Sequence, residues 1–152
     1  MLERKGAVSW MDSLTFGEEI QRISVSLNKK VMTNVKSLLQ HYGITPFQYH
    51  ILLIVERADT IPVTKVADEI KASPSVITAS ITRLYELNLV ERYHSKRDRR
   101  KVMVELTKKG KQVIQAAEKD MQQGVEKLFA CYKEEEQQQF LTLCRQLDEH
   151  VT

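Results

Sequence analysis

A short run of cationic residues is the feature of this 152-residue sequence with the clearest chemistry. Residues 92–111 hold nine Lys and Arg side chains against Asp98 and Glu105, a net charge of +7. Residues 1–91 balance ten basic against ten acidic side chains, and residues 112–152 carry a net charge of −4. Clustered positive charge attracts a polyanion and neutralises phosphates. The pattern predicts a nucleic-acid contact, although charge alone also fits a solvated surface loop.

The most cationic stretch, residues 95–101, lies between two segments that are typical of β-strands, residues 89–94 and 101–106. In the second segment Val102, Val104 and Leu106 alternate with Met103 and Glu105, as in a strand with one buried face. The sequence therefore predicts a β-ribbon with a cationic tip. The expected DNA-contacting residues of this tip are Lys96, Arg97, Asp98, Arg99, Arg100 and Lys101.

Two short helices joined by a tight turn are expected before the ribbon. The first contains residues 63–70, and the second begins at Ser73-Pro74, with Ser73 as N-cap, and runs to about Leu87. Small side chains on the outward face of the second helix allow close approach to another surface. Read alone, this face could equally be an ordinary polar surface. The candidates for DNA reading are Ser73, Ser75, Val76, Thr78, Ala79, Thr82 and Arg83.

Long amphipathic helices flank these elements. Apolar residues recur at three- and four-residue steps over residues 16–42 and again over residues 108–132, and a final acid-rich helix begins near Lys133. A core helix is expected after the Thr45-Pro46 start signal, because residues 51–55 are all apolar. The flanking stripes exceed what one small globule can cover, so they predict a second copy of the chain.

The order of these elements defines the expected fold class: mainly α with a small β-ribbon (α+β), a winged helix-turn-helix with N- and C-terminal dimerisation helices. In such a fold the second short helix enters the major groove. Its phosphate contacts come from basic side chains and helix N-termini, and a basic tip can place an arginine in the minor groove.

With these elements the chain resembles MarR-family transcriptional regulators over almost its whole length. The most specific motifs are the D-x-R pattern at Asp98 and Arg100 and the L-T-x-x-G pattern at Leu106, Thr107 and Gly110. The stretches at residues 44–49 and 66–90 fit as well. The resemblance implies that Arg100 reaches the minor groove and that Asp98 steadies the wing.

The resemblance further implies one MarR-type domain over residues 1–152. Residues 12–43 and 108–152 would form the dimerisation helices, and residues 45–107 the DNA-binding lobe. The expected function is sequence-specific regulation by a homodimer, a repressor on a pseudo-palindromic duplex operator, released by a small-molecule effector or an oxidant. The alternatives are an architectural or weakly specific DNA-binding protein, and a protein-binding adaptor that has kept the winged fold.

Several residues are candidates for signal sensing. Trp10, Tyr42, Tyr49 and His50 could line an effector pocket, although core packing is the favoured interpretation, and His50 is expected to be an interior residue. Cys131 is the redox candidate, whereas Cys144 lies on an apolar stripe and is expected to be buried.

The sequence also argues against other classes of protein. The four histidines show no ligand spacing, so we expect no metal and no other cofactor. Because no glycine-rich phosphate loop or nucleophile elbow is present, we expect no enzyme. No apolar run approaches the roughly 18 residues of a membrane span, and no signal peptide is evident, so we expect a cytoplasmic chain with no membrane partner.

Overall fold

The computed structural model describes residues 15–150. The chain divides into two compact units between Ser37 and Leu38. The N-terminal unit contains most of helix α1 (Phe16–His41), whose start is capped reciprocally by Thr15 and Glu18. The Thr15 amide and hydroxyl both donate to the Glu18 carboxylate and lower its pKa. Phe16 is 84% exposed and Leu27 54%, so the apolar stripe expected from the sequence lies open along this helix.

The second unit contains a lobe built around α2 (Pro46–Ala58). Thr45 and Gln48 form a capping box at its start, as the Thr45-Pro46 signal predicts. The core is completed by the inward faces of α3 (Val63–Ile70) and α4 (Pro74–Glu86). The fully buried side chains of α2 and α4 include Ile51, Leu52, Val55, Ile77 and Leu84.

A three-stranded antiparallel sheet closes the lobe in the order β1-β3-β2. The predicted ribbon is confirmed as β2 (Val90–His94) and β3 (Val102–Leu106), which pair from Val90 opposite Leu106 to His94 opposite Val102. The prediction of two strands misses β1 (Thr60–Pro62). A segment of three residues that ends in proline is too short to show the alternation typical of a strand. Its extended conformation depends on pairing with β3, which is distant in the sequence.

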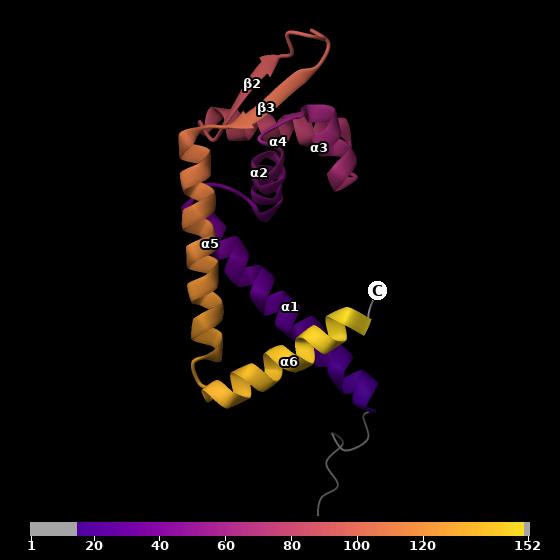
Figure 1. Ribbon diagram of the computed structural model, residues 1–152, viewed down its shortest axis with the longest axis vertical. Helices are drawn as coiled ribbons and strands as arrows, with labels where there is room; N and C mark the ends of the chain where they lie inside the picture. The colour runs from indigo at the N-terminus through magenta and orange to yellow at the C-terminus, as the bar shows by residue number, and fades with distance from the viewer. Residues whose placement is uncertain (1–14, 151–152) are drawn as a thin grey trace, which may run out of the picture. The chain divides into compact units, whose positions relative to one another are not determined.

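Two helices follow the lobe. Helix α5 (Lys108–Phe129) leads away from the sheet, and α6 (Glu134–His150) lies beyond a turn at its far end (Figure 1). Helix α5 ends three residues earlier than residue 132. Its buried residues, Gly110, Ile114 and Ala117, all lie near its start, and α6 has none.

The first turn of α5 is held tightly against the lobe. Thr107 caps the helix by accepting from the Gly110 amide at 2.9 Å, and its hydroxyl donates to the Asn88 carbonyl at 2.7 Å. A Cβ on Gly110 would lie 2.1 Å from the Leu89 carbonyl oxygen. The L-T-x-x-G motif is therefore the junction at which α5 and the lobe backbone meet with no room for a side chain.

The predicted fold class is confirmed: the described chain is mostly helical, with a small antiparallel sheet in a winged helix-turn-helix arrangement. No helix in residues 15–150 is long and apolar enough to cross a membrane.

Candidate nucleic-acid interface

Helix α4 presents the small residues expected to read DNA on its outer face. Ser73, Ser75, Val76, Thr78 and Ala79 are exposed, whereas Ile77 and Ile81 on the opposite face are buried. Val76 is 48% exposed, although it is a large apolar residue. The helix therefore has one packed face and one face of short side chains that a partner could approach closely.

The start of α4 differs from the sequence expectation in one detail. Ser73 stands at the N-cap position, but its side chain makes no cap hydrogen bond. Its hydroxyl lies 3.1 Å from that of Ser75, because the turn places the two side chains together. The first-turn amides of α4 are thus left without the Ser73 hydroxyl as acceptor, and an anion could take that role.

Other polar side chains of α4 are already engaged. Arg83 pairs with Glu86 at 3.2 Å, but both side chains are more than half exposed, so the pair can exchange for another partner. Thr82 is half-buried, and its hydroxyl donates to the Thr78 carbonyl at 2.8 Å.

The wing loop, residues 95–101 between β2 and β3, is fixed by its own hydrogen bonds. Asp98 accepts from the Arg100 amide at 3.1 Å, and its carbonyl accepts from the Lys101 amide at 2.9 Å. Ser95 accepts from the amides of Arg97 and Asp98 at 3.3 and 3.4 Å. Asp98 therefore orders the loop backbone, in agreement with the steadying role that the resemblance implies.

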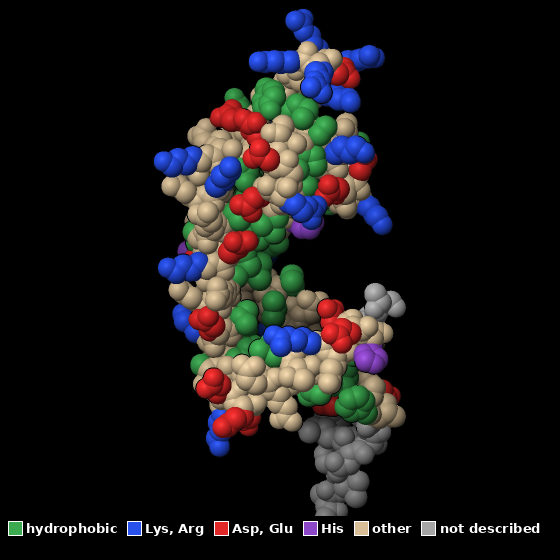
Figure 2. Space-filling model, viewed as in Figure 1, with side chains coloured by type: hydrophobic (Ala, Val, Ile, Leu, Met, Phe, Trp, Pro, Cys, Tyr) green, Lys and Arg blue, Asp and Glu red, His purple; other side chains and the backbone are tan. Residues whose placement is uncertain are grey.

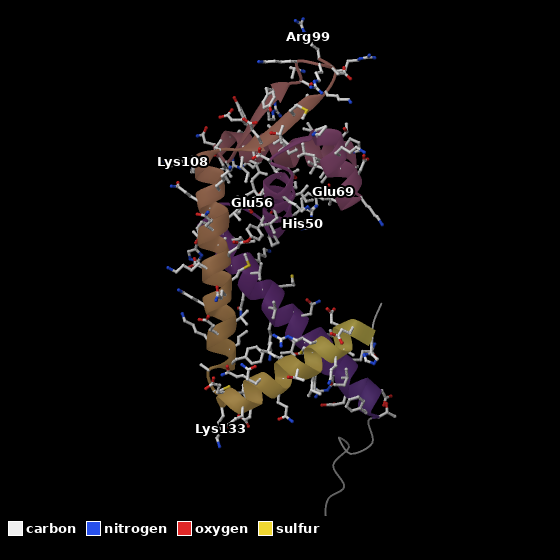
Figure 3. The ribbon with its side chains drawn as sticks, in the orientation of Figure 1. His50, Glu56, Glu69, Arg99, Lys108 and Lys133 are labelled. Atoms are coloured by element: carbon white, nitrogen blue, oxygen red, sulfur yellow. The ribbon has the colours of Figure 1, made fainter. Side chains whose placement is uncertain are left out.

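The cationic side chains of the wing loop project outward. The Arg100 side chain is 96% exposed, and its Nε lies 3.6 Å from the Asp98 carboxylate. Blue Lys and Arg side chains gather at this end of the molecule, where Arg99 marks the tip (Figures 2 and 3). The fold thus concentrates the positive charge on a rigid loop that extends past the lobe.

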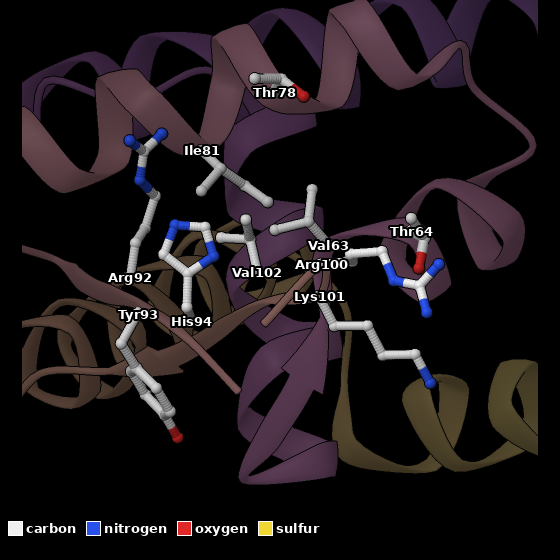
Figure 4. Close-up of a pocket in the computed structure, with 10 residues that line it drawn as sticks. All are labelled: Val63, Thr64, Thr78, Ile81, Arg92, Tyr93, His94, Arg100, Lys101 and Val102. Carbon is white, nitrogen blue, oxygen red and sulfur yellow. The ribbon is translucent and has the colours of Figure 1, made fainter. Parts of the chain in front are cut away.

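A cavity of about 430 Å³ lies between α4 and the wing. In Figure 4 Thr78 and Ile81 of α4 lie above, Arg92 and His94 of β2 lie to the left, and Thr64 of α3 lies beside Arg100 and Lys101 of the wing loop to the right. Three of its cationic residues, Arg92, Arg100 and Lys101, come from the ribbon. Its lining residues are Val63, Thr64, Thr78, Ile81, Arg92, Tyr93, His94, Arg100, Lys101 and Val102.

Arg92 is the residue of this region that the sequence predictions did not single out. Its Nη1 donates to the Thr82 hydroxyl at 2.9 Å, and its guanidinium carbon lies 5.4 Å from the centroid of the Tyr85 ring. In the sequence it is one more cation of the basic segment. Only the folded hairpin brings it against α4.

The structure describes three of the four expected effector-pocket residues. Trp10 lies outside the described residues. Tyr49 is 9% exposed, and burial raises the pKa of its hydroxyl. Tyr42 donates a hydrogen bond of 2.5 Å to Asp120 on α5, which raises the pKa of Tyr42. His50 is exposed, so the expectation of an interior histidine is wrong: it falls on the outer side of α2 (Figure 3).

The cysteine expectations have mixed outcomes. Cys131 is exposed just after α5, and its thiol lies 3.7 Å from the Leu128 carbonyl. Cys144 is also exposed in this chain, contrary to the expectation of burial, because its helix packs none of its residues into a core.

Within residues 15–150 no group of three or more His, Cys, Asp or Glu side chains is arranged to hold a metal ion.

The packed helix pair, the reading face and the basic wing together define a DNA-binding protein of the winged helix-turn-helix class. Residues 44–102 match the MarR family. The HTH-type transcriptional regulator YhbI of Bacillus subtilis (strain 168) is 32% identical over 68% of this chain and 67% of its own length. The HTH-type transcriptional repressor MdtR of the same strain is 28% identical over 60% of this chain and 59% of its own.

A solved structure is similar to this chain over a larger share of its length than either relative. It is a MepR-like protein complexed with pseudoligands, and its sequence is 36% identical to this one. The match covers 91% of this chain and 97% of the length of the MepR-like chain, with a TM-score of 0.60. The chain belongs to the MarR family of transcriptional regulators. The prediction that it is not an enzyme agrees with this membership.

Proposed function

We propose that this protein is a homodimeric repressor that binds a pseudo-palindromic duplex operator. In this proposal the reading helix α4 enters the major groove, and Arg100 enters the neighbouring minor groove. The proposal rests on two features that lie in the same lobe. Helix α4 exposes a face of short side chains, and the wing loop carries Arg100, whose side chain is 96% exposed. The two features match the two grooves of a duplex.

Base recognition would rest on short side chains. Ser75 and Thr78 supply hydroxyls, and Val76 and Ala79 supply methyl groups that can contact thymine. Arg83 is the long donor of this face, and it is available once the exposed pair with Glu86 opens. The remaining wing cations, Lys96, Arg97, Arg99 and Lys101, would contact phosphates and make binding strongly dependent on salt.

The dimer would form through residues 12–43 and 108–152, with residues 45–107 as the DNA-binding lobe. Apolar side chains are exposed on each of the described terminal helices, among them Ile20 on α1, Leu128 on α5 and Leu147 on α6. Exposed apolar stripes of this length are typical of an interface. A two-fold dimer would place its reading helices on half-sites about one helical turn apart.

Repression and release by a signal are the remaining parts of the proposal. The relative MdtR is named a repressor, and the MepR-like structure contains pseudoligands. A small molecule that tilts the long helices would change the spacing of the two reading helices and weaken one half-site. Oxidation of exposed Cys131 is the redox alternative.

The test is a binding measurement on a duplex that the protein itself selects from a random pool, with a scrambled duplex of equal length as competitor. Arg100→Ala should weaken binding to the selected duplex about 10- to 100-fold, while the melting temperature of the protein stays close to that of the unmodified chain. Arg57→Ala is the matched control and should bind normally, because Arg57 is exposed on α2, outside the reading helix, the wing and the proposed dimerisation helices.

Other results of this binding measurement would favour one of the alternative functions. Unchanged affinity of Arg100→Ala would contradict the wing assignment. Equal affinity for every duplex with a steep salt dependence would identify an architectural DNA-binding protein, and no binding at low salt would identify a protein-binding adaptor. A protection assay on the DNA beside its own gene, repeated with candidate effectors, tests the repressor and release steps.

A further inference from the structure

We propose that Arg92 is a positioning residue that locks the wing to the reading helix through the Thr82 hydroxyl. The inference rests on the proposed role of α4 as the reading helix. Arg92 lies on β2, opposite Val104 of β3, and so belongs to the rigid part of the hairpin rather than to its loop. Its side chain reaches from the hairpin to α4, where the guanidinium of Figure 4 points.

The guanidinium makes two contacts with one stretch of α4. It donates to the Thr82 hydroxyl at 2.9 Å and lies 5.4 Å from the Tyr85 ring centroid. Thr82 and Tyr85 are three residues apart and therefore share a helix face. A planar cation that is both hydrogen-bonded and placed over a ring has a defined orientation, which a lysine ammonium cannot reproduce.

The hydrogen bond of Thr82 to its own helix leaves it only an acceptor role toward other groups. A hydroxyl has one proton, and that of Thr82 goes to the Thr78 carbonyl at 2.8 Å. One of its two lone pairs accepts from Arg92. Thr82 therefore has no proton with which to donate to a base, although its residue type and its place on α4 make it a candidate reader.

The positive charge of Arg92 remains available to bind an anion. Within residues 15–150 its bond to Thr82 is the only hydrogen bond of the guanidinium, and no ion pair there involves it. It also lines the cavity between α4 and the wing. Arg92 can therefore meet a phosphate while it holds the helix and the wing at a fixed spacing.

Fixed spacing matters because two grooves must be engaged at once. Ser75 and Val76, near the start of α4, and Arg100 on the wing can reach their grooves together only at one helix-to-wing orientation. Loosening the Arg92 contact should therefore reduce discrimination between sequences more than it reduces nonspecific attraction. This expectation separates a positioning role from a purely electrostatic one.

The test compares charge-conserving and hydroxyl-removing variants in the full-length protein. The readout is the ratio of affinities for the self-selected and scrambled duplexes. Arg92→Lys and Thr82→Val should each lower this ratio about three- to tenfold, with an unchanged slope of affinity against salt concentration. The double variant should lose no more than the worse single one, because both remove the same contact.

Two controls keep the result interpretable. Thr82→Ser keeps the hydroxyl and should retain the full ratio. Thr82→Ala also removes the hydroxyl and replaces Thr82→Val should that variant not fold. Arg57→Lys alters another exposed arginine, bonded to Glu69 away from the reading face, and should behave as the unmodified protein. Melting temperatures within a few degrees of one another exclude a general loss of structure.

The overturning results are specific. An Arg92→Lys protein with a normal ratio would show that Arg92 acts through charge alone. Additive losses, with Thr82→Val altering preference at one base position, would show that Thr82 reads a base. Absence of any preferred duplex for the unmodified protein would instead contradict the proposed function, so the two failures are distinguishable.

Discussion

The DNA-binding lobe and the C-terminal helix are built in opposite ways from the same chain. Nearly all buried apolar side chains lie between Ile44 and Val104, whereas α6 buries none of its residues. Yet α6 contains Phe140, Leu143 and Leu147, each about half exposed or more. The lobe therefore has its own core. The apolar face of α6 is uncovered in one chain, as is typical of a helix that packs against a second chain. The comparison can be tested with matched substitutions.

The largest contrast is expected between Leu84→Ala in the lobe and Leu147→Ala on α6. Leu84 is fully buried, so its truncation leaves a cavity and should lower the free energy of unfolding by about 2–5 kcal/mol. Leu147 is 66% exposed in the chain, so its truncation should leave the lobe intact and weaken dimer association. Urea unfolding and sedimentation measure the two effects.

The reverse pattern would contradict this division. A Leu147→Ala protein that dimerises normally would show that this part of α6 is not an interface. Normal stability of Leu84→Ala would show that the lobe is not held by its own core.

The next effect is expected at the junction of the lobe and α5, where Gly110→Ala should lower the free energy of unfolding by about 3 kcal/mol. The added Cβ would lie 2.1 Å from the Leu89 carbonyl oxygen and 3.3 Å from Leu106 Cδ2. Since the near atom belongs to the backbone, α5 must move to relieve the clash. Urea unfolding gives the value, and a loss below about 1 kcal/mol would mean that α5 is not fixed against the lobe.

Local sequence signals were sufficient for most of the fold. The Thr45-Pro46 start, the 51–55 apolar run and the alternation in β3 each reflect a single element and predicted it correctly. The strand β1 was missed because its conformation comes from pairing Thr60 with Glu105, far along the chain. Periodicity within one segment cannot show such a partner.

The site divides in the same way. The wing candidates could be named because the Asp98–Arg100 motif lies in one short loop, which Asp98 orders by accepting from the Arg100 amide. Their contact with DNA stays a prediction. Arg92 was not identified, since its contact with Thr82 exists only after the hairpin folds onto α4. His50 was placed inside because it belongs to a largely apolar helix, but its side of α2 does not meet the core. Cys144 was placed inside because it lies on an apolar stripe, but in this chain no side of α6 meets a core.

The smallest effect is expected at Gly124→Ala, on the same helix as Gly110. Gly124 is exposed in the chain, and an added Cβ would meet no atom within 4 Å. Because alanine restricts the unfolded chain and favours a helix, the substitution should raise the free energy of unfolding by about 0.5–1 kcal/mol. A loss of stability, or weaker dimer association in sedimentation, would instead place a second copy of the chain close against this turn of α5. The two glycines of one helix thus report separately on packing within the chain and packing between copies.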